Sequence, residues 1–360
     1  MALETLELDG SIGEGGGQVL RVAVALSAII SKPLHIFNIR KRRGNPGLRP
    51  QHIAAVKLVA EACRAEVRGL AVGSGELFFK PRRLAGGDFS LDTGTAGSIT
   101  LILQSLLPVL SLGDRPSSFR LVGGTNNPMA PPIEYIEGVL LPVLERMGVD
   151  CEIELVRRGF YPRGGGVVRG VVRPSSVLHP IKMRGRTNIK RVDGLSYTCK
   201  LPQHISERMA ATAEKLLYQN GLEAHLVREA LTSQSPKCSL DPGAGLILTA
   251  VGADVAIGAD RLGEVGVPAE RVASETVAAM MGELSTGAPL DRHIGDMLVV
   301  WAALAEGESE YEVSALTSHT LTSVEVCRHL LNVDIRVEGR LGERGLVRCR
   351  GAGFKRFKEG

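Results

Sequence analysis

The chain has 360 residues, of which 43 are glycine, 44% are hydrophobic and 23% are charged, and its formal net charge is +4. The lack of a strict three-residue glycine period excludes a collagen-like chain, and the hydrophobic content excludes low-complexity disorder. The length predicts two or three domain-sized units with largely aliphatic cores, since only 4% of the residues are aromatic.

Glycine-rich turns that lead into aliphatic helices recur along the sequence. Three segments share this order, at residues 6–30, 92–106 and 290–304. In each, apolar residues follow the turn at the spacing of one helix face. Strand-like stretches lie between the helices, at 33–39, 119–121, 167–172, 311–316 and 333–337. The recurrence predicts a repeated α/β unit.

The region from 184 to 275 has its own strand, helix and strand patterns, at 195–198, 207–218 and 246–250. We interpret it as a smaller inserted α/β domain, which leaves 1–183 and 276–345 as one large domain. Residues 346–360 are rich in cations and are expected to form a solvated basic tail, with nucleic-acid binding the less favoured interpretation.

The cysteines and the N-terminal residues indicate the compartment. Six cysteines occur without a Cys-x-x-Cys pair, which fits neither a disulfide framework nor a zinc site, so we expect reduced thiols. The first ten residues include Glu4, Glu7 and Asp9 but no cation, which is not typical of a signal peptide. No apolar run approaches the roughly 18 residues of a membrane span. We therefore expect a cytoplasmic protein without membrane contact.

The glycine cluster from Gly13 to Gly17 contains one acid, Glu14. It departs from the dinucleotide-binding Gly-x-Gly-x-x-Gly pattern at its last position, and the chain has no Gly-Lys pair for a P-loop. A tight turn into a helix explains the glycines. Glu14 can coordinate a hard cation such as Mg²⁺ or Mn²⁺, or it can simply favour the positive end of the helix.

A second cluster, from Arg157 to Gly166, combines cations, two aromatic residues and three consecutive glycines. Contact with nucleic acid or phosphate is one interpretation. A hairpin that needs glycine for close packing is the other, and the residues alone do not separate the two.

His319 is the best-placed histidine for covalent chemistry. It follows the predicted strand at 311–316 and precedes Thr322-Ser323-Val324-Glu325, a capping-box pattern that predicts a helix start at Thr322. Near a helix N-terminus imidazole is favoured in its neutral form, which can attack phosphorus, and free N–H groups can hold a phosphate. From the residues alone, a capping or surface histidine is still the more frequent explanation. A lysine nucleophile in Lys190–Gly194 is disfavoured, because Arg191 stands where lysine is needed.

Several of these segments together resemble the RNA 3′-terminal phosphate cyclase family over nearly the whole chain. Asp9–Arg21 looks like the opening motif of that family, and Arg158–Val168 is similar to its signature. Further similar segments are Pro46–His52, Gly123–Asn126 with Met129–Pro131, and Ala315–Thr322, which resembles the nucleophile segment.

The resemblance implies a fold, a reaction and a set of site residues. The fold is α/β (α+β), with three repeated units of a four-stranded sheet and two helices, and a smaller inserted α/β domain. The reaction uses ATP and a covalent histidine–AMP intermediate to convert an RNA 3′-terminal phosphate into a 2′,3′-cyclic phosphodiester. The implied roles are His319 as nucleophile; Glu14 as ligand of Mg²⁺ or Mn²⁺; Arg21, Arg40, Arg43 and Gln51 for the RNA end; and Gln104, Pro131, His293, Ile294, Gly295, Asp296 and Met297 for ATP. His293 and Met297 differ from the tyrosine and glutamine of some relatives, which leaves the strength of the preference for ATP over GTP open.

Three alternatives remain at this stage. A catalytically inactive cyclase-like protein that acts in ribosomal RNA maturation would lack the nucleophilic histidine. An enolpyruvyl transferase would share the repeat architecture without needing His319 or the signature at Arg158–Val168. A plain RNA-binding module would explain the basic stretch Arg40–Arg49 but would leave Glu14 and His319 without roles. The sequence also leaves the formation of a homodimer open.

Overall fold

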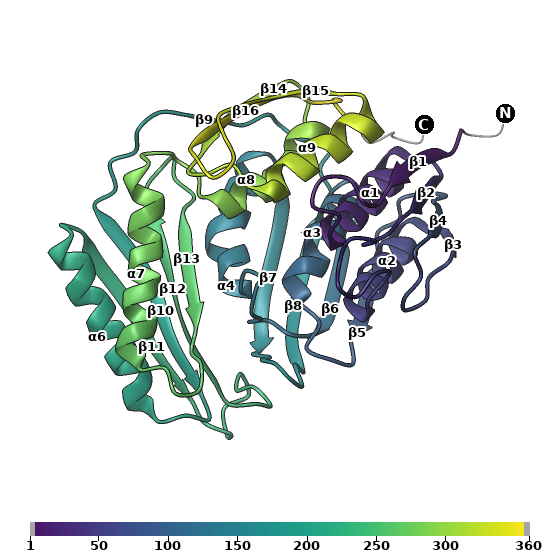
Figure 1. The fold of residues 1–360 in the computed structure, drawn as a ribbon. Coiled ribbons are helices and arrows are strands. Elements are labelled where there is room, and N and C mark those ends of the chain that lie inside the picture. The colour runs from purple at the N-terminus through teal and green to yellow at the C-terminus, as the bar shows by residue number, and fades with distance from the viewer. Residues whose placement is uncertain (1–3, 356–360) are drawn as a thin grey trace.

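The computed structural model describes residues 4–355. Its strands form four four-stranded mixed sheets, and helices pack against them (Figure 1). The predicted α/β (α+β) class is therefore confirmed. Among the described residues no helix has the length and apolar content needed to cross a membrane. The six cysteines are all free thiols.

The first repeated unit comprises β1 (Leu6–Asp9), α1 (Gly17–Ile30), β2 (Leu34–Phe37), α2 (Pro50–Cys63), β3 (Glu66–Arg68) and β4 (Leu77–Lys80). Its sheet order is β1-β2-β4-β3. The pair β1–β2 is parallel, so the chain must cross over through α1, whereas β4 runs antiparallel to both of its neighbours.

The second and third units repeat this order. The second comprises β5 (Asp88–Asp92), α3 (Ile99–Ser111), β6 (Ser117–Gly123), the helical run α4 (Ile133–Tyr135), η1 (Ile136–Leu140) and α5 (Leu141–Arg146), β7 (Asp150–Arg157) and β8 (Gly166–Arg173). The third comprises β9 (Lys182–Met183), α8 (Arg292–Leu304), β14 (Glu308–Val313), α9 (Ser318–Leu331), β15 (Asp334–Glu338) and β16 (Gly345–Arg350). Their sheet orders are β5-β6-β8-β7 and β9-β14-β16-β15, so the predicted threefold repeat is confirmed.

The fourth sheet belongs to the insertion, which separates β9 from α8 in the chain. It comprises β10 (Arg191–Cys199), α6 (Gln203–Gln219), β11 (Glu223–Leu231), β12 (Gly243–Val251), β13 (Gly258–Leu262) and α7 (Ala269–Ser285). In Figure 1, α6 and α7 lie side by side against this sheet. The expected limit at residue 275 falls inside α7, and Val277 and Met280 of that helix pack in the core of the insertion. We propose Ser285 as the end of the inserted unit.

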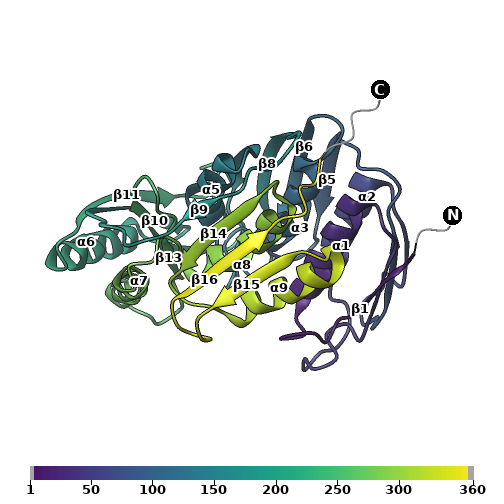
Figure 2. The same ribbon diagram turned by 90° about the horizontal axis from the view of Figure 1, so that it is seen from above.

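The helices of the three repeated units pack against one another, and their sheets lie towards the outside of the molecule (Figure 2). Helix α1 contacts α2, α3 and α9, and α8 contacts α9, so apolar residues from all three units share one core. This packing brings the N-terminal ends of α1 and α9 together, although they are about 300 positions apart in the sequence.

Helix α9 begins at Ser318, so the predicted start at Thr322 is wrong. The capping residue is Thr317, whose Oγ1 accepts a hydrogen bond of 3.0 Å from the backbone N–H of Thr320. The Thr322 hydroxyl instead donates to the Ser318 carbonyl one turn earlier, at 2.7 Å, which places Thr322 inside the helix. His319 is therefore the second residue of the helix.

The C-terminal segment is only partly a tail. Residues 346–350 belong to β16 of the third sheet, where they pair with β14 and β15. Residues 356–360 of the expected basic tail lie outside the described residues.

The Arg157–Gly166 cluster forms a tight hairpin, which supports the second of its two interpretations. Gly164 has a φ of +67°, and a Cβ at this position would lie 2.6 Å from the Thr95 carbonyl oxygen. The Arg158 guanidinium is fully buried over the ring of Tyr197, 4.0 Å from its centroid, and pairs with Glu229 and Glu134. Arg158 thus joins the second unit to the insertion and does not face solvent.

Replacing Arg158 with methionine is expected to lower the free energy of unfolding by about 2 kcal/mol, because two carboxylates lose their shared partner. The loss stays below that of a fully buried pair, since Glu229 keeps 20% exposure. Arg163→Met is the matched control. Arg163 is 61% exposed and pairs with Asp241, so its loss should cost less than about 1 kcal/mol. Equal losses in urea denaturation would contradict the assigned role of Arg158.

Candidate active site

One cavity of about 1200 Å³ collects most of the predicted site residues. It lies between the repeated units and the insertion, and its lining includes Glu14, Arg21, Arg40, Arg43, Gln51, Gln104, Pro131, His293, Asp296, Met297 and His319. Ile294 and Gly295 do not line it. Ile294 is fully buried, and a Cβ at Gly295 would lie 2.7 Å from the Val313 side chain, so these two residues serve the packing of α8 against β14.

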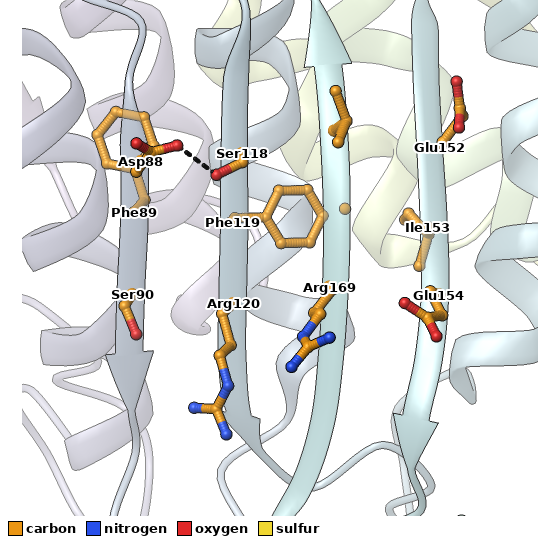
Figure 3. A pocket seen from close by; sticks show the side chains of 12 residues that line it. Asp88, Phe89, Ser90, Ser118, Phe119, Arg120, Glu152, Ile153, Glu154 and Arg169 are labelled. Atoms are coloured by element: carbon orange, nitrogen blue, oxygen red, sulfur yellow. Dashed lines mark hydrogen bonds between the residues drawn. The ribbon is translucent and has the colours of Figure 1, made fainter.

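A smaller cavity of about 560 Å³ lies on the sheet of the second unit (Figure 3). Its floor includes Arg120 and Arg169, which are cross-strand neighbours on β6 and β8. Ser118 donates a 2.5 Å hydrogen bond to Asp88 at its edge. No residue that the sequence pointed to as catalytic or ligand-binding lies there.

The glycines in the turn before α1 allow side chains that line the large cavity to pack close to the backbone of this turn. Gly13 and Gly15 have φ values of +56° and +59°. A Cβ at Gly16 would lie 2.4 Å from Glu14 Oε1, and a Cβ at Gly17 would lie 2.2 Å from His52 Nε2. The glycines therefore leave room for the side chains that line the site.

His319 is oriented by two residues from the start of α1. Its Nδ1 lies 2.6 Å from Gln18 Oε1 and 3.1 Å from Glu14 Oε1. The Gln18 amide nitrogen donates to the His319 carbonyl at 3.3 Å and to Ser323 Oγ at 2.7 Å, which fixes the amide oxygen towards the ring. Both groups near Nδ1 are acceptors, which in the neutral ring favours the tautomer with the proton on Nδ1 and the lone pair on Nε2. No hydrogen bond from the described part of the chain reaches Nε2.

Glu14 is the acidic centre of this part of the cavity. Its Oε1 accepts a hydrogen bond of 2.9 Å from Arg43, and its Oε2 accepts one of 3.2 Å from Ser318 Oγ. Only 17% of its side chain is exposed. Within residues 4–355 no group of three or more His, Cys, Asp or Glu side chains could hold a metal ion by itself. A cation bound at Glu14 would therefore need ligand oxygens from substrate or water.

Four arginines, Arg21, Arg40, Arg43 and Arg49, give the same part of the cavity a strong positive charge. Burial lowers the pKa of Arg21 to about 10, and its Nε is buried without a hydrogen-bond partner. Burial, followed by Arg49 and Arg43, also lowers the pKa of Arg40. An unpaired buried donor beside other cations fits an anionic ligand, which would supply both charge and acceptors.

His52 is buried beside this arginine cluster, and its imidazole is neutral at physiological pH. Burial, with further contributions from Arg21, Arg40 and Arg49, lowers its pKa to about 3. Its Nδ1 accepts a 3.1 Å hydrogen bond from the backbone N–H of Arg49. His52 therefore supports the loop that carries the arginines without adding to the charge.

Two aspartates, the buried Asp291 and the half-buried Asp296, hold the helices that frame the site. Asp291 caps α8 and accepts hydrogen bonds from the backbone N–H groups of His293 and Ile294 at 2.8 and 2.9 Å. Asp296 accepts from the hydroxyls of Thr317 and Thr320 at the start of α9. Burial raises the pKa of Asp296, and these hydroxyl donors oppose that shift. The segment around Asp296 thus positions the first turn that carries His319.

The family model for RNA 3′-terminal phosphate cyclase matches residues 12–337 of the chain. The chain belongs to this family. It is 44% identical to the RNA 3′-terminal phosphate cyclase of Desulfurococcus amylolyticus, covering 98% of this chain and 100% of that protein. It is 46% identical to the enzyme of the same name from Caldivirga maquilingensis, covering 92% and 94% of the two chains. A solved EPSP synthase from Acinetobacter baumannii aligns over 97% of this chain and 82% of that chain, but with 14% identity and a TM-score of 0.28 this likeness carries no weight.

Sequence reasoning missed several residues of the cyclase cavity. Gln18 and His52 lie inside segments that resemble the family, but nothing in their spacing indicated a function for either residue. Asp260 and Arg261 are adjacent charged residues on β13 of the insertion, a short strand that the sequence patterns did not predict. Only the packing of the insertion against the repeated units shows that this face closes the cavity.

Proposed function

We propose that this chain converts the 3′-terminal phosphate of RNA into a 2′,3′-cyclic phosphodiester at the expense of ATP. Three transfers at phosphorus make up the reaction. His319 Nε2 attacks the α-phosphorus of ATP and pyrophosphate leaves. The RNA 3′-phosphate then takes the AMP from histidine, and the adjacent 2′-hydroxyl attacks that phosphate, releasing AMP and, overall, one proton.

The observation that carries this proposal is the geometry of His319 beside the arginine cluster. Its Nδ1 is held by Gln18 and Glu14, so the free Nε2 is the nucleophilic atom. A phosphate oxygen is a poor leaving group, and transfer of AMP replaces it with a better one. Charge accumulates on several phosphates in each step, and Arg21, Arg40 and Arg43 line the same cavity to offset it. We assign Arg21, Arg40, Arg43 and Gln51 to the RNA phosphate and its neighbourhood.

We assign the divalent ion, Mg²⁺ or Mn²⁺, to Glu14. A single carboxylate with open ligand positions suits an ion that shares its remaining ligands with phosphate oxygens and water. When bound, such an ion offsets phosphate charge. Without it, Glu14 still orients Nδ1 of His319 and holds Arg43.

The nucleoside of ATP is assigned to the less basic part of the cavity. Pro131, His293 and Met297 offer flat or apolar surfaces there, and the His293 ring meets Tyr135 edge-on at 6.2 Å. Imidazole and thioether groups can both cover the face of a base. Gln104, whose side-chain oxygen accepts a long 3.4 Å hydrogen bond from Arg21, lies between this part and the arginines.

The direct test is an RNA oligonucleotide with a labelled 3′-phosphate. With ATP and Mg²⁺ or Mn²⁺ the label is expected to become resistant to phosphatase and to remain so until the ring is opened by acid. The same RNA without ATP is the control. A label that stays sensitive to phosphatase in every condition would leave the chain without the proposed activity.

Replacing Gln18 with leucine is expected to slow adenylation of His319 by roughly 10-fold. Loss of a hydrogen bond that orients a functional imidazole typically costs about 10- to 100-fold in metal sites, and Glu14 remains as a second acceptor at Nδ1 here. Gln18→Glu keeps an acceptor for Nδ1 but loses the amide N–H₂ that donates to the His319 carbonyl and to Ser323 Oγ, so it should recover only part of the loss. Single-turnover rates measure the effect, and equal rates for the parent and Gln18→Leu would show that Gln18 has no orienting role.

A further inference from the structure

Asp260 is an acidic residue that the insertion contributes to the large cavity. It lies on β13, where its register partner on β12 is Ile247, and it lines the cavity together with His293 and Met297. No hydrogen bond or ion pair from the described residues reaches its carboxylate. Burial raises the pKa of Asp260 to about 6, so the group remains largely ionised at neutral pH. Asp260 is half-buried in the cavity wall, so a ligand that displaces water from its carboxylate must supply a hydrogen-bond donor in its place.

The charges around Asp260 separate it from the phosphate-binding part of the cavity. After burial, the largest electrostatic influences on it come from His293, Glu134, Asp291 and Arg261. Glu134 is already paired with Arg158, and Asp291 is bonded to Tyr135 and to backbone N–H groups. Such an environment disfavours a phosphate. It favours a neutral ligand that brings a donor.

We propose that Asp260 is the residue that selects adenine, by accepting a hydrogen bond from the 6-amino group of the base. The inference rests on the proposed use of ATP and extends it to the choice of base. An ionised carboxylate has acceptors only, so it matches an amino group. A guanine held in the same orientation would place its 6-oxo group against that carboxylate, where two acceptors meet and neither is satisfied. The contact would add base discrimination to the flat and apolar surfaces that His293 and Met297 offer in the same part of the cavity.

The test measures nucleotide binding to the full chain with α,β-methylene triphosphates, which cannot transfer AMP. Three bases are compared: adenine, guanine and purine, which lacks the 6-amino group. Asp260→Ala should weaken the adenine form by about 10-fold and leave the purine form within about twofold. Equal weakening of both forms, or of neither, would overturn the proposal.

Asp260→Asn supplies a second, independent readout. An amide can present its oxygen to the 6-amino group or turn its N–H₂ towards a 6-oxo group. The variant should therefore keep the adenine form and gain about 10-fold or more for the guanine form. Unchanged guanine binding would overturn the proposal.

Asp254→Asn is the control for these variants. Asp254 lies in the same insertion, is 71% exposed and pairs with Arg146 away from the cavity, so none of the three affinities should change. Failure of the inference is distinguishable from failure of the proposed function. If ATP labels His319 but the Asp260 variants bind all three bases as the parent does, only the inference fails. If no triphosphate binds to any form, the proposed function fails.

Discussion

Replacing His319 with alanine is expected to abolish the covalent AMP adduct, with labelling by α-labelled ATP falling to less than about one-thousandth of the parent level. The reason is the geometry at the start of α9, where Gln18 and Glu14 hold Nδ1 and leave Nε2 as the only free ring nitrogen. Removal of a covalent nucleophile costs several powers of ten, because no other group takes over the bond that it forms. The measurement is the radiolabel retained on the denatured chain, which should be acid-labile as expected of a phosphorus–nitrogen bond.

His329→Ala provides the matched control on the same helix. His329 lies three turns further on and hydrogen-bonds through Nε2 to the Glu7 carbonyl at 2.7 Å, outside the cavity. Its removal should leave labelling unchanged. If His319→Ala labelled as well as the parent, the nucleophile would be another residue and the assignment of His319 would be wrong.

The sequence predicted the repeated unit because each copy repeats a local pattern of glycine turn, helix and strand. It did not predict which helices of the different units pack against one another. Glu14 and His319 share a hydrogen-bond network only because α1 packs against α9 in the core of the three units. The resemblance to the cyclase family assigned both residues to one reaction, but neither it nor the spacing along the chain predicted their contact.

Local sequence patterns gave a wrong or incomplete prediction where a second feature of the chain competed with them. The capping-box pattern at Thr322 is real in the sequence, but Thr317 also has a hydroxyl and comes first. The helix therefore starts after Thr317, and Thr322 lies inside it and donates to the Ser318 carbonyl. Likewise the Arg157–Gly166 cluster left contact with nucleic acid open, but its Arg158 is neutralised by Glu134 and Glu229, which come from other parts of the chain. A charge pattern on one segment cannot reveal partners that only the tertiary structure supplies.

Replacing Arg43 with alanine is expected to weaken binding of RNA with a 3′-phosphate by roughly 1.5 to 3 kcal/mol, as for a charge-assisted hydrogen bond. RNA that ends in a 3′-hydroxyl should lose much less. Arg43 lines the cavity with 42% of its side chain exposed, and it already donates to Glu14 at 2.9 Å, so part of the guanidinium is fixed and part remains available to the terminal phosphate. Arg43→Lys should recover only some of the loss, since an ammonium group cannot form the paired contacts of a guanidinium.

The neighbouring Arg42 tests whether the effect belongs to the site or to the basic segment. Arg42 is exposed, does not line the cavity and has no ion pair among the described residues. Arg42→Ala should therefore weaken both RNAs slightly and equally, with an effect that disappears as salt is raised. The Arg43→Ala difference between the two RNA ends should persist at the same salt, because a partly enclosed contact is screened less than a surface charge. Equal losses for the two ends on removal of Arg43 would make it a general backbone contact, and the recognition of the terminal phosphate would then fall to Arg21 and Arg40.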